Sequence, residues 1–446
     1  MRLSNEEAYQ NNGGNMKRKI LLAILLIVAS ALLFANGSAE SKEKEIVTIW
    51  HCNTGKTGDA FQTIIDEFNE GIGKDFGIEI EAIYQGKAND VLTKVKASDD
   101  KTLPDIAQMD ATAATDMNLS EYLVPAANLP ISTANFVGSA LSAYTSEKGL
   151  LALPFNASAL LFYYNKTLFD SLTLSVPKTL DEFAAIASKL GETENGKVTR
   201  YAFAGIPTTY ELTTFIGSQN GLSYLVNNKN GHTGTPTEVL FGTEGTYKAF
   251  LEKWKALYDT GYVGNITSSV STEFAAGRTA SMLASSSNLT TVLDSVGDAF
   301  EVGVAPVPMV NEKATGGTAI GGGGLFAFDD REATVKVLEY LTSASVQQFW
   351  SEATGYFPIN AETFDSAEYA SFVEENPLFA IAPEYAISSN PLLTNVWLPS
   401  AYQIYYSFQS NIQKVTAENM DIDKAVEEMV TIIEDALISY AEQNIN

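Results

Sequence analysis

Strand-like and helix-like segments alternate along most of this chain, and the alternation constrains its fold more than any other feature. Residues 46–50 read Ile-Val-Thr-Ile-Trp, as in a strand, and 59–69 follow with apolar side chains at helical spacing. A second strand at 78–84, a helix at 89–97 and a third strand at 105–109 continue the pattern. Because strands joined by helices pair in parallel, we predict an α/β fold with mainly parallel sheets.

The carboxyl ends of these strands should meet at one edge of the sheet, where open α/β sheets bind ligands. Asn53 follows the first strand and Asp110 follows the third, so we expect both side chains at this edge. Asp110 also stands in the position of a helix N-cap, which is the structural alternative. The sequence Gly-Lys-Thr at 55–57 is not a phosphate loop, because Trp50 stands where that motif requires glycine.

The chain is too long for one hydrophobic core. It has 446 residues, of which 45% are hydrophobic, and this length suits two lobes. Further along we expect helices and strands at 180–190, 201–204, 246–258, 279–284, 302–307 and 325–328, then an almost wholly helical end that closes with an amphipathic segment at 422–443.

The N-terminal segment predicts export. Residues 16–39 combine a cationic start, a long apolar run and small residues near the end, which is the pattern of a cleaved signal peptide. The apolar run is nearly long enough to span a bilayer, so a membrane anchor is the alternative. Residues 1–15 do not fit a signal, and we interpret them as a spurious extension before a true start at Met16. We expect a periplasmic protein that is not inserted in the membrane after cleavage.

Composition excludes several classes of function. A formal net charge of −26 disfavours binding to nucleic acid and to anionic membranes. Cys52 is the only cysteine, so no internal disulfide forms, and two histidines leave little for zinc chemistry. His51 and Cys52 have no partner at metal or nucleophile spacing. We therefore expect no metal and no cofactor.

Five motifs in a fixed order carry a family resemblance. They are Pro-Asp-Ile at 104–106, the stretch 154–166 with its small polar tetrad at 156–159, Gly-Arg-x-Ala at 277–280, four glycines at 321–324 and Thr-Gly-Tyr-x-Pro at 354–358. Together they resemble the bacterial extracellular solute-binding proteins of ABC sugar importers, in the branch similar to glycerol-3-phosphate- and maltose-binding proteins. The resemblance implies a two-lobed, type II-like periplasmic binding protein that is not an enzyme. The implied N-terminal lobe is 45–155 with 285–328, and the C-terminal lobe is 156–284 with 329–446.

The resemblance also implies a ligand site in the cleft between the lobes. The ligand contacts that the resemblance implies are Asp110, Ser158, Ser286 or its neighbour Ser285, Gly322 or its neighbour Gly323, and Tyr356. To these the residue pattern adds Asn53 for a hydroxyl group, and Tyr210 and Trp397 as flat apolar faces for a sugar ring. For each aromatic residue the alternative is packing, and for the glycines it is a turn.

One departure from the family bears on the ligand. The phosphate-binding branch has a late arginine, whereas no arginine follows Arg331 here and 390–397 reads Asn-Pro-Leu-Leu-Thr-Asn-Val-Trp. Phosphate recognition usually needs such a cation. We therefore predict a monomer that closes on a neutral mono- or oligosaccharide or polyol and delivers it to the transmembrane subunits of an ABC permease. No cysteine follows the apolar run, so a lipid anchor is not expected.

Two alternatives stay open. The first is an importer component that binds glycerol-3-phosphate or a phosphodiester. The second is a secreted carbohydrate-active hydrolase, in which Asp110 and Glu211 would flank the scissile bond.

Overall fold

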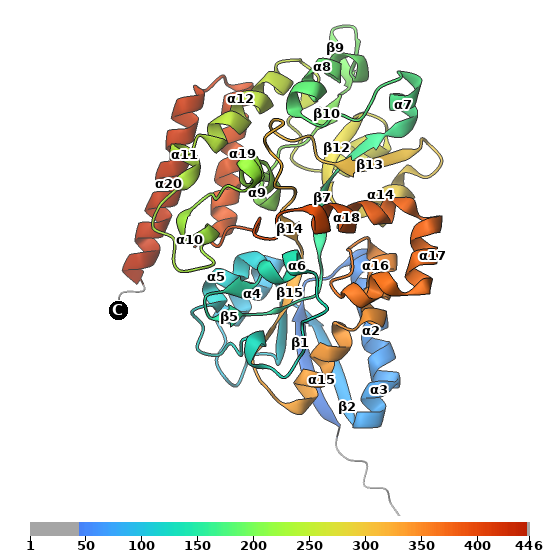
Figure 1. The fold of residues 1–446 in the computed structure, drawn as a ribbon, viewed down its shortest axis with the longest axis vertical. Coiled ribbons are helices and arrows are strands. Elements are labelled where there is room, and N and C mark those ends of the chain that lie inside the picture. The colour runs from blue at the N-terminus through green and yellow to red at the C-terminus, as the bar shows by residue number, and fades with distance from the viewer. Residues whose placement is uncertain (1–43, 444–446) are drawn as a thin grey trace, which may run out of the picture.

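The computed structural model describes residues 44–443, which form two α/β lobes, one above the other in Figure 1. The expected extension at 1–15 and signal peptide at 16–39 lie outside the described residues. Within 44–443, no helix combines the length and the apolarity needed to cross a bilayer.

The first lobe is built on a five-stranded sheet. In spatial order its strands are β2 (Ile78–Tyr84), β1 (Glu45–His51), β3 (Ile106–Asp110), β15 (Gly323–Ala327) and β6 (Leu153–Pro154). The first three are parallel, as predicted, and β15 runs antiparallel to both of its neighbours. In β1 the side chains of Val47 and Ile49 are fully buried and alternate with less buried ones, which is the period of a strand packed on one face.

Helices pack on this sheet and bury its hydrophobic core. They are α2 (Gly55–Glu70), α3 (Ile72–Phe76), α4 (Ala88–Lys96), α5 (Ala114–Met117), α6 (Gly138–Ser142), α15 (Glu332–Leu341) and α16 (Ala344–Thr354). The predicted apolar stripe of α2, including Phe61 and Phe68, is buried in a core shared with β1, α15 and Trp350 of α16. A small antiparallel pair, β4 (Thr145–Ser146) with β5 (Gly149–Leu150), leads into β6.

The second lobe has its own sheet. Its strands in spatial order are β11 (Val263–Gly264), β10 (Phe203–Ala204), β12 (Ser281–Ser285), β7 (Ser158–Asn165) and β13 (Val302–Pro306), with β14 (Ile320–Gly321) paired to the start of β7. All but the last two residues of β7 are buried, because this central strand has neighbours on both edges and cover on both faces.

The remaining elements belong mainly to this second lobe. They are α7 (Lys166–Ser171), α8 (Leu180–Leu190), β8 (Glu192–Glu194), β9 (Lys197–Arg200), α9 (Thr209–Gly217), α10 (Asn227–Asn230), α11 (Leu240–Thr243), α12 (Thr246–Tyr258), α13 (Val270–Ala275), α14 (Leu289–Val296), α17 (Ala367–Glu375), α18 (Ile381–Ser388), α19 (Ala401–Ala417) and α20 (Ile422–Gln443). The bounds of α8 and α20 are those that the sequence pattern predicts.

Three segments carry the chain between the lobes, and they lie side by side. Asn156 joins β6 to β7, and its backbone exchanges hydrogen bonds with that of Gly323, where the chain returns from β14 to β15. The third segment follows α16, and its Phe357 N–H donates to the carbonyl of Ala157 at 2.8 Å. These backbone contacts tie the crossings into one hinge.

Two parts of the chain lie elsewhere than the expected lobe division places them. Residues 302–306, expected in the first lobe, form β13 and pair with β7 of the second sheet. Residues 332–354, expected in the second lobe, form α15 and α16 and pack on the first sheet. The serines at 285–287, where the expected lobe division implies a crossing, instead turn the chain from β12 into α14 and back to the same sheet. Hydrogen-bond partners that are distant in sequence decide these positions, and local patterns do not report them.

Gly322 offers a test of the hinge. Its φ is +117°, and a Cβ atom there would lie 2.0 Å from the carbonyl oxygen of Asn156. We expect Gly322→Ala to destabilise the fold by about 1–3 kcal/mol or more, because the left-handed backbone and the clash both oppose it. Gly323→Ala is the matched control, since its Cβ would meet only ordinary contacts from 3.5 Å. Thermal unfolding measures both, and equal melting temperatures for the two variants would contradict the hinge argument.

Candidate functional site

The end of β3 brings the two lobes together through one carboxylate. Asp110 caps the 3₁₀ turn Ala111–Ala113, where its Oδ1 accepts hydrogen bonds from the backbone N–H of Thr112, at 3.0 Å, and from its hydroxyl. Its Oδ2 accepts a hydrogen bond of 2.5 Å from the hydroxyl of Tyr402, in the first turn of α19. Asp110 is therefore both the N-cap of the structural alternative and a contact across the cleft.

Asn53 supports this edge from within the first lobe. Its side chain is 7% exposed and exchanges two hydrogen bonds with the amide of Gln108, at 2.8 and 3.3 Å. Both of its polar atoms are thus engaged by β3, so Asn53 orients the strand end that carries Asp110.

A second group of polar side chains gathers at the hinge. Tyr210, in the first turn of α9, lies beside Ser158 and Ser285, and its hydroxyl oxygen has no hydrogen-bond partner among the described residues. Gly321 allows this approach, because a Cβ atom there would lie 3.1 Å from the Tyr210 ring and 3.0 Å from the Ser158 hydroxyl. The cluster therefore combines side-chain hydroxyl groups with the backbone of a glycine.

Tyr356 and Ser286 enter the hinge from other directions. Tyr356 is half-buried, stacks on Trp350 with 5.7 Å between ring centroids, and lies near Ser287 and Asn156. Burial raises the pKa of its hydroxyl, which therefore stays a neutral hydrogen-bonding group. Ser286 is 1% exposed and its Oγ accepts from the N–H of Ala159 at 3.3 Å, so it holds the start of β7.

Trp397 packs at the contact between the lobes. It comes from the second lobe but lies in a buried cluster with first-lobe residues such as Met109 and Ala113. One face of its indole stacks on His232 at 4.0 Å between centroids, and its Nε1 has no partner within the described chain. An imidazole thus covers one face of the ring that the sequence assigns to a sugar, and the side chain as a whole is 2% exposed.

His232 joins the lobes in the same region. Its Nδ1 lies 2.9 Å from the carbonyl oxygen of Thr145, in the first lobe, and its Nε2 lies 2.9 Å from that of Asn395, in the second. Burial lowers the pKa of the imidazole. A neutral ring donates only one of these contacts, so His232 stacks on Trp397 and donates one hydrogen bond, to the carbonyl of either Thr145 or Asn395.

The structure also brings in residues that the sequence analysis does not predict as ligand contacts. Asn156 and Asn395 are less than 10% exposed, and each has an Oδ1 without a hydrogen-bond partner among residues 44–443. The amide nitrogen of Asn395 donates one hydrogen bond to the carbonyl of Ile320 at 2.7 Å, and its Oδ1 remains an acceptor without a partner. Asn156 belongs to the predicted polar tetrad, whereas Asn395 and Tyr402 carry no local signal.

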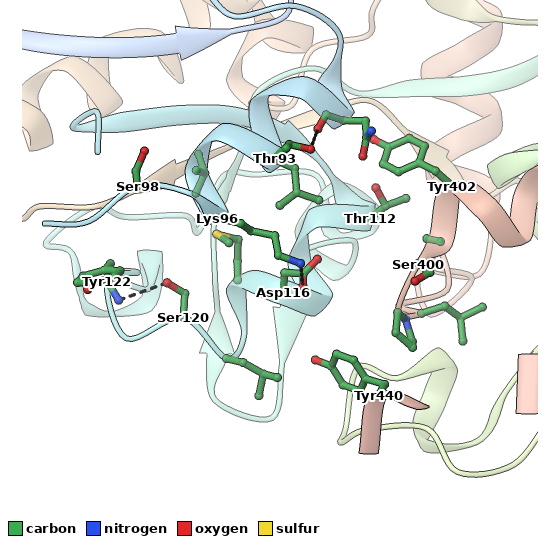
Figure 2. A pocket seen from close by; sticks show the side chains of 18 of the residues that line it. Thr93, Lys96, Ser98, Thr112, Asp116, Ser120, Tyr122, Ser400, Tyr402 and Tyr440 are labelled. Atoms are coloured by element: carbon green, nitrogen blue, oxygen red, sulfur yellow. Dashed lines mark hydrogen bonds and ion pairs between the residues drawn. The ribbon is translucent and has the colours of Figure 1, made fainter. Parts of the chain in front are cut away.

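Two cavities adjoin the Asp110–Tyr402 contact, and Tyr402 lines both. The larger, of about 910 Å³, lies between α4 and α5 of the first lobe and the segment 398–403 and Tyr440 of the second (Figure 2). The smaller, of about 440 Å³, is lined by second-lobe residues that include Glu211, Tyr405 and Tyr406.

The residues that line the two cavities carry little positive charge. Among the described residues that line the larger one, Lys96 is the only cation, and it pairs with Asp116 at 2.6 Å. The described lining of the smaller one has none, and burial raises the pKa of Glu211 to about 7 there. No three His, Cys, Asp or Glu side chains in the described part of the chain are grouped to hold a metal ion.

Two lobes hinged by three crossing segments, with polar groups and the larger cavity between them, define a two-domain binding protein of the periplasmic type, as predicted. The sequence pattern of the bacterial extracellular solute-binding proteins matches residues 63–380, and the chain belongs to this family. The resemblance inferred from the five motifs is thereby confirmed.

Similar proteins agree with this assignment. The sn-glycerol-3-phosphate-binding periplasmic protein UgpB of Yersinia pestis is 26% identical over 388 residues, which cover 83% of this chain and 86% of that protein. UgpB of Mycobacterium tuberculosis, in complex with glycerophosphocholine, superposes with a TM-score of 0.73 at 21% identity, covering 89% of this chain and all of that one. The GacH receptor of Streptomyces glaucescens, solved with acarbose, gives 0.73 at 18% identity, with 88% and 98% covered. These relatives are named as binding proteins and not as enzymes.

Tyr402→Phe tests the contact across the cleft. Removing the hydroxyl deletes a hydrogen bond to a charged group, worth about 1.5–3 kcal/mol, so the ligand-free protein should shift toward an open form. Small-angle scattering should show a larger radius of gyration than for the wild type. Tyr406→Phe, on the same helix but 71% exposed, is the control and should change nothing. Identical scattering from both variants would argue against the contact.

Glu211→Gln tests the buried acid. Because the folded protein holds this proton up to about pH 7, the unfolding free energy of the wild type should fall as the pH rises from about 4.5 to about 7. Gln keeps the cap on Thr208, whose N–H donates to Glu211 at 2.7 Å, but does not ionise. The variant should therefore gain thermal stability relative to the wild type between about pH 5 and about pH 8. A constant difference across that range would show that Glu211 titrates normally.

Proposed function

We propose that this solute-binding protein of an ABC importer binds a neutral carbohydrate between its lobes, in the periplasm, and delivers it to the transmembrane permease. The ligand would be a mono- or oligosaccharide or a polyol. The observation that carries the proposal is the set of buried, unpartnered donors and acceptors around an uncharged hinge: Tyr210 Oη, Asn156 Oδ1, Asn395 Oδ1 and Trp397 Nε1. Buried polar atoms need partners, and sugar hydroxyls both donate and accept.

The proposed contacts follow from this arrangement. Asp110 would accept from ligand hydroxyls in place of Tyr402, and Ser158, Tyr210, Tyr356 and the backbone at Gly322 would surround the ligand at the hinge. Trp397 would contribute its edge. Asn53 and Ser286 would act indirectly, because their side chains form hydrogen bonds with β3 and β7 and so position these strands.

Among the described residues that line the two cavities, none is an unpaired cation, and this favours a neutral ligand over glycerol-3-phosphate. The last arginine of the chain, Arg331, pairs with Asp105 at 2.6 Å and with Glu45 at 2.7 Å. Asp105 precedes β3, so this guanidinium lies at the opposite end of the strand from Asp110. The names of the relatives favour the phosphate ligand, which makes the comparison of the two ligands the decisive one.

A hydrolase would need two carboxyl groups that are free to act in acid–base catalysis. Both oxygens of Asp110 accept hydrogen bonds in the ligand-free protein, and Glu211 caps its own helix. Binding that depends on lobe closure needs no such pair. Incubation with glycans should therefore leave their chain length unchanged.

Intrinsic fluorescence titration with sugars, polyols and glycerol-3-phosphate tests the proposal. At least one neutral carbohydrate should give a saturable change, and glycerol-3-phosphate should bind more weakly. Asp110→Asn should weaken binding about ten- to a hundredfold, because its ligand bonds would lose their charge. The exposed Asp298→Asn is the control and should bind as the wild type does. Tight binding of glycerol-3-phosphate, or no response to any neutral carbohydrate, would overturn the proposal.

A further inference from the structure

The larger cavity lies next to the side chains that contact Asp110. Thr112 and Tyr402 both donate hydrogen bonds to Asp110, and both line the cavity of about 910 Å³. A ligand held at Asp110 is therefore one side chain away from this space. The cavity therefore begins beside the proposed site and extends along α4 as far as Leu103 and Phe328.

Both lobes contribute walls to this cavity. Figure 2 shows Ser400, Tyr402 and Tyr440 on one side of it, and Thr112 and Asp116 facing them from the first lobe. Since its walls belong to different lobes, the cavity has this shape only when the lobes are close together. A ligand that fills it would contact both halves and stabilise the closed form.

The chemistry of the walls matches a sugar chain. Tyr122, Tyr402 and Tyr440 contribute aromatic rings, which suit the C–H faces of sugars. Hydroxyl groups come from Thr93, Thr112, Ser120 and Ser400. Lys96 and Asp116 neutralise each other at 2.6 Å, so they offer a donor and an acceptor without selecting a charged ligand.

We propose that this cavity is an outer subsite and that the ligand is an oligosaccharide that runs from Asp110 into it. The inference rests on the proposed function and narrows it. The volume lies near the upper end of ligand pockets, which range over about 300–1,000 Å³, and one sugar ring would leave most of it to water. Each further sugar unit would replace that water with contacts to both lobes.

Two measurements test the chain length of the ligand. The first is native mass spectrometry of the exported protein with the ligand that co-purifies. The second is titration with homologous series: glucose, maltose, maltotriose and maltotetraose, with parallel series built on galactose, mannose and xylose. We expect a bound mass of two or more sugar units, and an affinity that rises at least tenfold from monosaccharide to trisaccharide in one series.

Tyr440→Ala tests the cavity itself. This change should lower the affinity for the trisaccharide about tenfold and leave that for the monosaccharide unchanged, because only the longer ligand reaches α20. A general structural defect would weaken both. Tyr84→Ala is the control, since Tyr84 is 52% exposed at the edge of the first sheet and does not line this cavity.

The outcomes separate the two proposals. If a bound monosaccharide or polyol is found and longer chains bind no better, the subsite is wrong and carbohydrate binding stands. Equal loss of mono- and trisaccharide affinity in Tyr440→Ala also overturns the subsite. If no carbohydrate of any length binds or co-purifies, the proposed function fails and the subsite fails with it.

Discussion

The backbone hydrogen bonds between Asn156 and Gly323 are the constraint on which the rest of the structure depends. They hold two antiparallel crossings together, and Phe357 adds the third by donating to Ala157. Gly322 makes the arrangement possible, because its positive φ and missing side chain let the returning strand pass against the Asn156 carbonyl. With three short connections fixed to each other, the lobes can move about one axis and have few other ways to move.

The two sides of the cleft differ in the kind of contact that joins the lobes. On the side of α14, α17 and α18, a continuous apolar core packs the crossings against the second sheet, so that side stays closed (Figure 1). On the other side the lobes meet through polar contacts, the Asp110–Tyr402 hydrogen bond and the His232 bridge, with cavities beside them. Polar contacts exchange readily with water or with ligand hydroxyls, whereas opening an apolar core exposes its surface at a cost of about 25 cal/mol per Å². The cleft therefore opens on its polar side, next to the proposed site.

In the described part of the chain, the last arginine and the lysine that lines the larger cavity are both paired with carboxylates. This arginine is held by three carboxylates near the start of β3, and Lys96 in the larger cavity is paired with Asp116. The stretch 390–397, where the resemblance leads us to expect the arginine of the phosphate-binding branch, contains Asn395, which has an unpartnered acceptor, and Trp397, which has an unpartnered N–H. An acceptor beside a single donor suits hydroxyl groups better than a phosphate, which needs several donors or a cation.

Much of the fold was determined by the sequence alone. The periods of 2 and 3.6 in the apolar residues fixed the parallel strands β1, β2 and β3 and the long helices α8 and α20, because these patterns depend on local geometry. Tertiary structure alone decided the rest. It placed β13 in the second sheet and α15 on the first, and it brought Tyr402 to Asp110 across 292 positions of sequence. It also gave Asn53 and Ser286 supporting roles and covered one face of Trp397 with His232. Such assignments depend on which distant groups meet after folding, and no spacing along the chain encodes that meeting.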